Sequence, residues 1–552
     1  MTLIQICQVC DENVLRPIIV TWKSIVMNNP YYIFSFHLIH CIDDKELLLN
    51  FEKDFKDIHP DIVIKLYYHI PNLDYHNNRL KHVSKATMLK LYIPVLLNEI
   101  QKVLYLDTDI LVTNDLDRIW KLDCGETGLC IKSSIMPLWK EKDGYRCGNA
   151  GVILMDLNTL RTNNFTEKVL ASNLEEPTDD QEHINKYARG KYNDLNANMN
   201  IFVNQDDNNC TDPIIYHFIG PNKPWNSNSK NYLFKLWESY NKISLPLSSK
   251  NNETTGIGVL IYNTTNFGDW TQTAAALYVW WIYFRRPDTF KNFVEDCIVK
   301  SKMGPYPISW INRDKISEYN KPKGIDKLVI LCNAWWMKKN SNDEYSFIPQ
   351  DFIKPIYISF HIANVCLMTD KVIQYLKMHE PIGCRDTSTK DLLERKGVKA
   401  YFSGCLTMTL NLRDTKLGFT TLNNYVRNKV SVDYKHETSK NYIQLTQLMI
   451  DVDNKYNIVI TVQRCYDLLS SCEVLTTRLH MWLPLICNKA NIQLINIETN
   501  EEFKNGDCDN HRQKINRFNG IVETVKDKSK LEVFKCLLLN NTLYEINKNL
   551  SK

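Results

Sequence analysis

Two aspartates separated by one residue give the most specific chemical signal in this sequence of 552 residues. Asp107 and Asp109 follow the apolar run Val103–Leu106, which predicts a strand buried on both faces. Ligand sites form at the ends of such strands. In an extended backbone, residues two apart point the same way, so both carboxylates can reach one divalent cation. A cation held there can neutralise charge on a departing diphosphate, although a bare Asp-x-Asp is also common as a solvated turn.

Two further segments favour the site over the solvated turn. Asn149 lies in a small-residue turn before another buried apolar run, in CGNAGVILMDLNTLR. Downstream, Asp180 and Gln181 stand at a predicted helix start, where acidic residues also serve merely as caps. These side chains are candidates to surround a substrate held by the cation.

The segment HFIGPNKPW combines three residue types that suit a metal-bound diphosphate. His217 supplies an imidazole, which suits manganese better than magnesium, although a lone histidine is more often structural. Gly220 allows a ligand to approach the backbone closely. Lys223 can contact a phosphate as a point charge.

The order of these segments, over roughly Leu3 to Tyr240, resembles the family 8 glycosyltransferases. The opening CDENVLRPIIVTWKSIVMNN is similar to the family's first strand, nucleotide-contacting loop and first helix. The resemblance implies a UDP-sugar donor, Mn²⁺ or Mg²⁺, a glycan or other acceptor, and retention of anomeric configuration. It also implies roles for single residues: Asp107, Asp109 and His217 as metal ligands, Gly220 and Lys223 on the diphosphate, Asp11 near the base, and Asn149, Asp180 and Gln181 around the donor sugar and acceptor.

One residue of the donor-binding set departs from the family pattern. The segment SKATMLKLYIP has Lys90 where the family usually has an arginine. A lysine offers a point charge in place of a planar fork, which changes how a donor can be recognised.

The second half carries a different set of polar residues. GVLIYNTTNFGDWTQ predicts a strand, a glycine-containing loop at Gly268 and Asp269, and a helix whose first amides could face an anion. Arg385 follows a predicted short strand, before a capping-box-like helix start at Ser388. Arg478 and His480 lie beside an apolar run. Paired guanidinium groups suit a ligand with carboxylate and phosphate groups, although a single arginine usually makes a structural ion pair.

This second set resembles the polysaccharide pyruvyltransferases, over about Gly256 to Asn500. The resemblance implies that Arg385 and Arg478 bind phosphoenolpyruvate, that His480 is a general acid, and that Gly268 and Asp269 belong to the binding site. Met481 replaces the glycine that commonly follows the Arg-Leu-His triplet. Two alternatives stay open for this half: a second glycosyltransferase, or an inactive module that binds a glycan or a partner.

Alternation of strand-length apolar runs with helical patterns predicts an α/β protein with parallel sheets. We expect a family 8-like domain over residues 1–245, with a single Rossmann-like (GT-A type) fold. A polar linker over 246–256 would lead to a two-lobed Rossmann-like (GT-B-like) domain over 257–552. The predicted strands are Ile4–Val9, Phe34–Ile39, Ile62–Tyr68, Val103–Leu106, Val259–Tyr262, Leu328–Leu331, Ile356–Phe360, Val398–Phe402, Ile458–Val462 and Ile492–Ile497.

Composition argues against several other classes of protein. The chain is 44% hydrophobic and 24% charged with a net charge of +4, typical of a globular protein and no reason to expect nucleic acid as a partner. The most apolar later stretch, Ala274–Phe284, has about half of the roughly 20 residues that a transmembrane helix needs. With no secretory signal and 17 scattered cysteines, we expect a cytoplasmic protein, in the host cytoplasm if the source is a virus.

Overall fold

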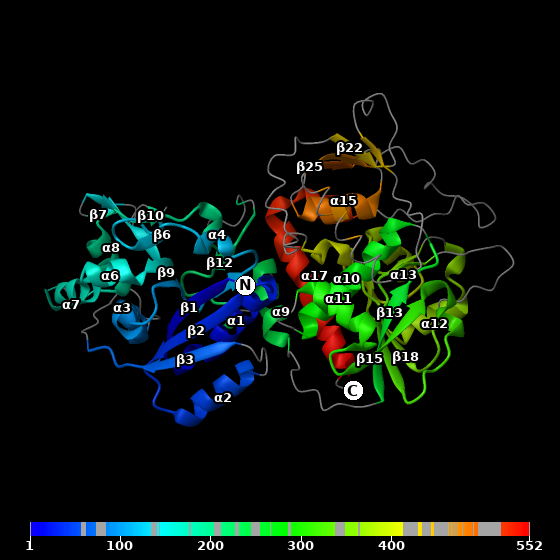
Figure 1. Cartoon of the computed structure of the whole chain (residues 1–552), viewed down its shortest axis with the longest axis horizontal. Helices are drawn as coiled ribbons and strands as arrows, with labels where there is room; N and C mark the ends of the chain where they lie inside the picture. Colours follow the sequence, from blue (N-terminus) through cyan, green and yellow to red (C-terminus); the bar gives the residue numbers. More distant parts are fainter. Residues whose placement is uncertain are drawn as a thin grey trace. The chain divides into compact units, whose positions relative to one another are not determined.

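The computed structural model describes residues 2–56, 62–72, 84–133, 141–142, 144–175, 178–203, 210, 212–226, 231–243, 254–264, 266–284, 289–336, 348–362, 365–411, 429–432, 443–445, 462, 465–466, 469, 472–476, 478–488, 491–494 and 520–550. The chain forms two compact units, Met1–Leu247 and Ser248–Lys552 (Figure 1). Most of the predicted linker lies outside the described residues.

The first unit is built on a seven-stranded sheet in the order β10-β6-β9-β4-β1-β2-β3. The strands β1, β2, β3 and β4 run parallel, whereas β9 runs antiparallel to both β4 and β6. The prediction of a parallel sheet is therefore wrong for β9, the one strand of this sheet that runs against the others, whereas β10 pairs in parallel with β6. The bounds of its strands are β1 Leu3–Cys10, β2 Ile33–His40, β3 Val63–Tyr68, β4 Lys102–Leu106, β6 Leu129–Ser133, β9 Gly148–Asp156 and β10 Asn193–Asp194.

A smaller sheet, in the order β11-β12-β5, carries the chain past the end of β4. Its strands are β11 Ile201–Phe202, β12 Ile215–His217 and β5 Ile110–Val112, and a separate hairpin joins β7 Glu141–Lys142 to β8 Tyr145–Arg146. The helices of the unit are η1 Glu12–Val14, α1 Leu15–Asn28, α2 Lys45–Lys56, η2 Lys85–Tyr92, α3 Ile93–Leu96, α4 Asp117–Trp120, α6 Leu157–Thr162, α7 Phe165–Glu175, α8 Asp180–Ala188, η3 Ala197–Met199 and α9 Tyr232–Lys242.

A buried apolar core holds the central strands of the first unit together. Val103, Tyr105, Ile153 and Met155, from the central strands β4 and β9, are fully or almost fully buried and belong to one apolar cluster. Leu89 of η2 packs into the same cluster. Burial of these side chains holds the ends of β4 and β9 together, and the candidate site forms at those ends.

The second unit contains two principal sheets. The first has the order β14-β15-β13-β16-β18, parallel except for β14, and the second is the parallel sheet β23-β22-β24-β25. Its strands are β13 Thr255–Ile261, β14 Lys302–Met303, β15 Tyr306–Asn312, β16 Lys327–Leu331, β17 Trp335–Trp336, β18 Ile353–Ile356, β19 His361–Ile362, β20 Ile382–Cys384, β21 Ala400–Phe402, β22 Lys429–Val432, β23 Ile443–Leu445, β24 Glu473–Thr476 and β25 Asn491–Leu494.

Helices connect these strands, as the sequence predicts for an α/β unit. They are α10 Phe267–Phe284, α11 Phe290–Val299, η4 Arg313–Glu318, η5 Val365–Leu367, α12 Asp370–Lys377, α13 Thr387–Arg395, η6 Leu406–Thr409, α15 Leu479–Cys487, α16 Ile521–Lys526 and α17 Lys528–Leu550. The mixed α/β class is thus correct, and the assignment to a GT-B-like fold stays a prediction.

One predicted strand of the second unit is displaced. The run Ile356–Phe360 was expected to be extended, but β18 ends at Ile356. Ser359 has a φ of +56°, a left-handed conformation that interrupts a strand. The predicted strand Ile458–Val462 lies almost entirely outside the described residues, as does the end of Ile492–Ile497.

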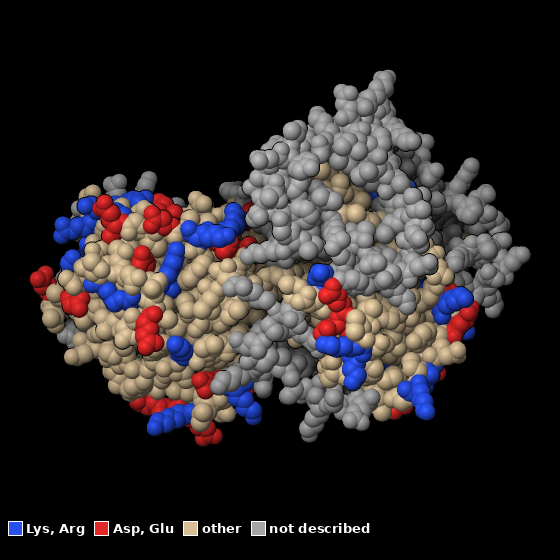
Figure 2. Space-filling view, viewed as in Figure 1, with Lys and Arg blue, Asp and Glu red and all other residues tan. Residues whose placement is uncertain are grey.

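The surface carries charges of both signs. Basic and acidic side chains are interspersed over the described parts of the face in Figure 2, in keeping with the small net charge. None of the described helices is long and apolar enough to cross a membrane.

Candidate active site

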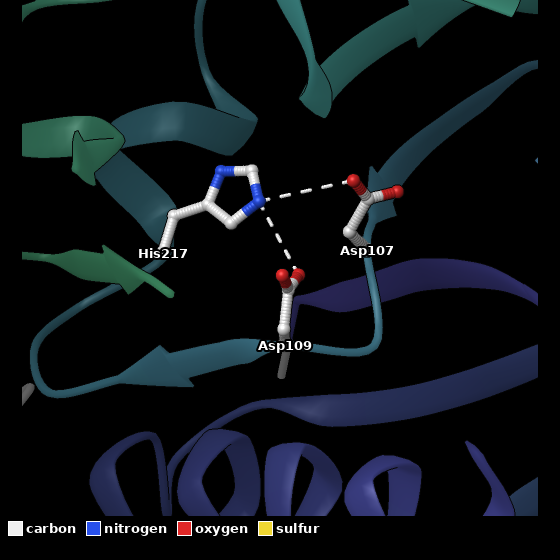
Figure 3. A group of neighbouring side chains, drawn as sticks. All are labelled: Asp107, Asp109 and His217. Carbon is white, nitrogen blue, oxygen red and sulfur yellow. Dashed lines mark ion pairs between the residues drawn. The ribbon is translucent and has the colours of Figure 1, made fainter. Parts of the chain in front are cut away.

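Three side chains from distant parts of the first unit converge on one point (Figure 3). Asp107 and Asp109 lie between β4 and β5, and His217 ends β12. Nε2 of His217 is 3.2 Å from Oδ1 of Asp109 and 3.8 Å from Oδ2 of Asp107. One ligand atom from each residue lies within 4.8 Å of the others. Two carboxylate oxygens and one imidazole nitrogen at this spacing form a candidate metal site.

Strand pairing on both sides brings the triad together. Asp107 donates its backbone N–H to the carbonyl oxygen of Gly151 (2.8 Å), and Phe218 donates its own to that of Asp109 (3.0 Å). The backbone bends at Asp109, so the expectation of an extended Asp-x-Asp is wrong. The two carboxylates still converge, because β9 fixes one end of the bend and β12 fixes the other.

Gly151 leaves the space that the triad occupies. A Cβ atom at this position would lie 2.7 Å from Oδ2 of Asp107 and 2.9 Å from Nε2 of His217. These separations are too short for any other residue without displacing a ligand atom. The sequence placed Gly151 in a small-residue turn but gave no reason to tie it to His217.

The charges around Asp109 fit a cation site. Asp109 is 7% exposed, and its Oδ1 is buried without a hydrogen-bond donor. Burial would raise the pKa of this carboxyl, but His217 and Lys223 hold the pKa below its usual range. The Lys223 ammonium contacts Oδ2 of Asp109 and the carbonyl oxygen of Phe218 (2.8 Å). Asp109 is therefore kept as a carboxylate whose free oxygen faces the imidazole, a donor set suited to a divalent cation.

Lys90 joins the triad to the start of α8. Its Nζ lies 3.3 Å from Oδ1 of Asp107, 2.6 Å from Oδ2 of Asp180 and 2.9 Å from the carbonyl oxygen of Ala150. Burial would lower the pKa of Lys90, but the two aspartates raise it above its usual range. Tyr105 also donates a hydrogen bond to Oδ1 of Asp107 (2.7 Å). An ammonium has three protons, so the two aspartates and the Ala150 carbonyl oxygen account for every donor of Lys90.

Three amide side chains line the other side of the triad. Asn200 contacts Nδ1 of His217 (3.1 Å) and donates from Nδ2 to Oδ1 of Asn149 (3.1 Å). Asn149 in turn donates to Oε1 of Gln181 (3.2 Å). The structure therefore joins Asn149 and Gln181 to the triad through Asn200. The sequence gave no signal for Asn200, because its contact depends on the pairing of β11 with β12.

The remaining predicted residues of this unit lie in turns. Asp11 follows β1 and caps η1, where its carboxylate accepts a hydrogen bond from the backbone N–H of Asn13 (2.9 Å). Gly220 has a φ of +78°, and a Cβ atom there would meet nothing within 4 Å. Its backbone conformation, rather than crowding, favours glycine.

The first unit matches glycosyl transferase family 8. The matched residues are 5–229, which contain the triad, Lys90 and the three amide side chains. The sequence-based resemblance to this family is thus confirmed for the first half of the chain.

Individual relatives are similar over this region. Glycosyltransferase GlyE of Streptococcus pneumoniae serotype 4 is 30% identical over 184 residues, which cover 30% of this chain and 43% of that protein. General stress protein A of Bacillus subtilis is 27% identical over 187 residues, covering 29% of this chain and 65% of that protein. The chain thus spans less than two thirds of each. A crystal structure of the galactosyltransferase LgtC with donor and acceptor sugar analogues has a TM-score of 0.37 and 20% identity, covering 43% of this chain and 95% of that one.

The second unit has a pocket of about 420 Å³, its open mouth included. Predicted residues from three separate segments line it together with Trp335, to which the sequence did not point. The lining residues are Asn266, Asp269, Trp335, Arg385, Arg478, Leu479 and His480.

Arg385 is the unusual member of this pocket. Its side chain is 1% exposed, yet Nε and Nη2 have no hydrogen-bond acceptor. The carboxylate of Asp386 lies 3.8 Å from Nε, but it accepts hydrogen bonds from Thr389 N (2.8 Å) and contacts Nδ1 of His361 (2.6 Å). A buried guanidinium with open donors is costly unless an anion completes it.

The first amides of α10 do not have the anion-binding role that the sequence predicted for them. The backbone N–H of Gly268 donates to the side chain of Asn266 (2.9 Å), and that of Asp269 donates to the Asn266 carbonyl oxygen (3.2 Å). These amides, in the first turn of α10, are therefore engaged by Asn266 rather than open to an anion. Burial raises the pKa of Asp269, while Arg313, 3.7 Å away, opposes that rise.

The helix after Arg385 begins two residues earlier than the sequence suggested. Asp386, not Ser388, is the N-cap of α13, and its side chain accepts the hydrogen bond from Thr389. Asp386 therefore both caps α13 and pairs with His361.

Proposed function

We propose that the first unit transfers a sugar from a UDP-sugar to a glycan or other acceptor, with retention of anomeric configuration and with Mn²⁺ held by Asp107, Asp109 and His217. The observation that carries the proposal is the convergence of these three side chains within 4.8 Å, inside the region that matches family 8. A cytoplasmic location stays a prediction from the sequence.

The donor set argues for manganese among the common divalent cations. Two carboxylates and an imidazole suit Mn²⁺, whereas Mg²⁺ prefers oxygen ligands alone. A cation bound there would neutralise charge on the diphosphate as the glycosidic bond breaks. Lys223, which contacts the same carboxylate as the cation would, adds a second positive charge next to the leaving group.

The other predicted residues are assigned to the sugar, to the carboxylates of the site, and to the diphosphate and base of the donor. Asn149, Asp180 and Gln181 are proposed to line the donor-sugar and acceptor pocket. Lys90 is proposed to hold Asp107 and Asp180 in place, because its ammonium touches both carboxylates. Gly220 is proposed to lie beside the diphosphate, and Asp11 beside the base.

A panel of UDP-sugars, each incubated with and without Mn²⁺, tests this proposal by release of UDP. At least one UDP-sugar should be hydrolysed or transferred in the presence of Mn²⁺ only. Asp109→Asn should reduce that turnover by at least about a hundredfold, because it removes a charged ligand from the site. Turnover near that of the natural protein in a folded Asp109→Asn variant would contradict the metal assignment.

For the second unit we propose pyruvyl transfer from phosphoenolpyruvate, on the strength of the open donors of Arg385. In this reaction two hydroxyls of a sugar bond to carbon 2 of phosphoenolpyruvate, and the methylene carbon takes up a proton to become a methyl group. Of the two hydroxyl protons, one leaves with the phosphate and the other replaces the proton given to the methylene carbon. Arg385 and Arg478 would bind the anionic groups, and His480 would supply the proton. Asp269 would line the same pocket, and the unit would then belong to a two-lobed, GT-B-like fold.

Calorimetry with phosphoenolpyruvate on the full chain tests this second proposal. Arg385→Gln should weaken binding about ten- to a hundredfold, the effect of one lost charge-assisted contact. His480→Ala should spare binding and slow transfer, because a proton donor acts on the chemical step. If millimolar phosphoenolpyruvate does not bind the folded protein, the second unit is better explained as a second glycosyltransferase or as an inactive binding module.

A further inference from the structure

The three amide side chains beside the triad form a chain whose direction can be worked out atom by atom. Two backbone N–H groups anchor it: Ala150 donates to Oε1 of Gln181 (3.1 Å), and Gly151 donates to Oδ1 of Asn149 (3.0 Å). A backbone N–H can only donate, so the side-chain atoms that face these two groups must be oxygens. The orientations of both amides follow from this, without a choice between oxygen and nitrogen.

The orientation of Asn200 then follows from that of Asn149. The atom of Asn200 that faces Oδ1 of Asn149, at 3.1 Å, must be the nitrogen. Its oxygen is therefore the atom 3.1 Å from Nδ1 of His217. An amide oxygen only accepts, so Nδ1 of His217 must carry a proton. Nε2 is then the ring nitrogen that can give up a proton and offer its lone pair, beside Asp107 and Asp109, to a cation.

Burial makes this arrangement rigid. Asn200 is fully buried and His217 is 2% exposed, so neither polar group can turn to water for a replacement partner. The backbone carbonyl of Asn200 is also tied down, because Lys132 donates to it from Nζ (2.8 Å). Turning the Asn200 amide around would place two acceptors against each other at Asn149 and leave Nδ1 of His217 facing a donor.

At its other end the chain fixes Gln181. Oε1 of Gln181 already accepts from Asn149 (3.2 Å) and from the backbone of Ala150 (3.1 Å). Both lone pairs of this oxygen are therefore in use. The amide nitrogen is the part of Gln181 left to meet a ligand, and it can only donate a hydrogen bond. A sugar oxygen that accepts fits this position.

We infer that Asn200 is a positioning residue, which holds His217 in the tautomer that offers Nε2 to a cation and, through Asn149, helps to hold Gln181 with its amide nitrogen available to the sugar. This inference rests on the proposed glycosyl transfer, since it concerns the cation and the sugar of that reaction. It adds that the two are linked by one hydrogen-bonded chain. Removing Asn200, which contacts both His217 and Asn149, should therefore disturb both ends, and changing only one of its bonds should disturb one end.

Two substitutions at Asn200 distinguish the effect on the His217 end of the chain from the effect on the Gln181 end. Asn200→Ala removes both hydrogen bonds. Asn200→Asp keeps an acceptor for Nδ1 of His217 but loses the donor to Asn149. Mn²⁺ affinity would be measured without any nucleotide, by the electron paramagnetic resonance signal of free Mn²⁺. The kcat and KM of the UDP-sugar hydrolysed by the natural protein would be measured at saturating Mn²⁺.

We expect Asn200→Ala to weaken Mn²⁺ binding about ten- to a hundredfold, the usual effect of removing a partner that orients a metal-binding histidine. Asn200→Asp should bind Mn²⁺ within about threefold of the natural protein, since its carboxylate still accepts from the imidazole. It should nevertheless lower kcat/KM for the donor at least about tenfold, because the new carboxylate faces Oδ1 of Asn149, acceptor against acceptor, and displaces Asn149 together with its hydrogen bond to Gln181.

Asn173→Ala is the matched control. Asn173 is a buried asparagine of the same unit and also contacts a histidine, Nε2 of His183 (3.0 Å). Its loss should lower stability and leave Mn²⁺ affinity unchanged. If Asn200→Ala binds Mn²⁺ as tightly as the natural protein, or if both Asn200 variants lose metal affinity equally, the inference is wrong. If the natural protein itself binds no Mn²⁺, the proposed metal-dependent transfer fails, and the inference fails with it.

Discussion

Gly151 and His217 are packed so closely that a Cβ atom on the glycine would lie 2.9 Å from Nε2 of the histidine, and closer still to its Cε1. We therefore predict that Gly151→Ala weakens Mn²⁺ binding by at least about tenfold, because the methyl group must push the imidazole or Asp107 aside. The expected loss of unfolding free energy is about 1–3 kcal/mol, typical of overpacking. Metal titration and urea denaturation measure the two effects.

Gly324→Ala is the control for this exchange. Gly324 has a φ of +77°, and a Cβ atom there would meet nothing within 4 Å. The substitution should cost about 1–2 kcal/mol through backbone strain alone and leave Mn²⁺ binding as it was. Equal metal affinity in the two alanine variants would mean that the triad tolerates a displaced histidine.

Replacement of Lys90 by methionine should be strongly destabilising. The side chain is 2% exposed and pairs with two carboxylates, so its loss leaves the buried carboxylate of Asp180 and the partly buried one of Asp107 without their cation. We expect the first unit to lose about 3–5 kcal/mol of unfolding free energy. Lys121→Met removes an exposed pair with Asp117 and should change stability by less than about 1 kcal/mol. A Lys90→Met variant as stable as the Lys121→Met variant would refute the structural role of Lys90.

Asp179 should make stability depend on pH. It is the N-cap of α8, and burial together with the neighbouring Asp180 raises its pKa to about 6. Between its unfolded pKa of about 3.9 and pH 6, the folded carboxyl keeps a proton that the unfolded one releases. Its stabilising contribution is therefore present at low pH and is lost as pH rises through about 6.

Asp179→Asn should remove this dependence, because asparagine also caps a helix but carries no charge. The amount by which the variant's unfolding free energy exceeds that of the natural protein should grow from near zero at about pH 4 to at most about 3 kcal/mol above pH 7. Thermal unfolding across this range measures it, with Asp156→Asn, at the N-cap of α6, as the matched exchange. An advantage that does not change with pH would show that Asp179 is ionised throughout.

A fragment that ends at Leu247 should fold and hydrolyse a UDP-sugar by itself. It contains the triad, Lys90 and the amide chain, and it corresponds to the first compact unit. Circular dichroism and UDP release would test it beside the full chain. An insoluble fragment, or a folded fragment without activity, would mean that this unit depends on the second half.

Sequence patterns were most informative where a signal is local. The apolar run before Asp107 predicted β4 to within one residue, whereas the small-residue turn predicted at Asn149 is wrong, because Gly148 to Gly151 are the first residues of β9 itself. The antiparallel pairing of β9 was not predictable, because an apolar run buried on both faces has the same sequence pattern in a parallel and in an antiparallel strand. The close approach of Gly151 to His217 depends on that pairing, so it could not be foreseen either.

Contacts between distant segments were beyond prediction for the same reason. Asn200 and His361 carry no motif, and each matters only because a strand places it beside another polar group. Lys90 was assigned to the donor from its motif alone, whereas its three acceptors come from segments far along the chain. In the second unit, the segments of Asp269, Arg385 and Arg478 were recognised separately, and the fold brings them to one pocket.

The ion pair between Asp109 and Lys223 joins positions 114 residues apart. On the ribosome, therefore, the two aspartates emerge well before the lysine and the histidine that balance them. At about 5–20 residues per second, the interval is on the order of ten seconds. During that time Asp109 lacks both His217 and Lys223, whereas Lys90, which contacts Asp107, has already been synthesised. The first unit can therefore reach its final form only after its last segment has been synthesised, and a chain cut short before His217 would keep the most conspicuous motif of the sequence while lacking the imidazole that completes the triad.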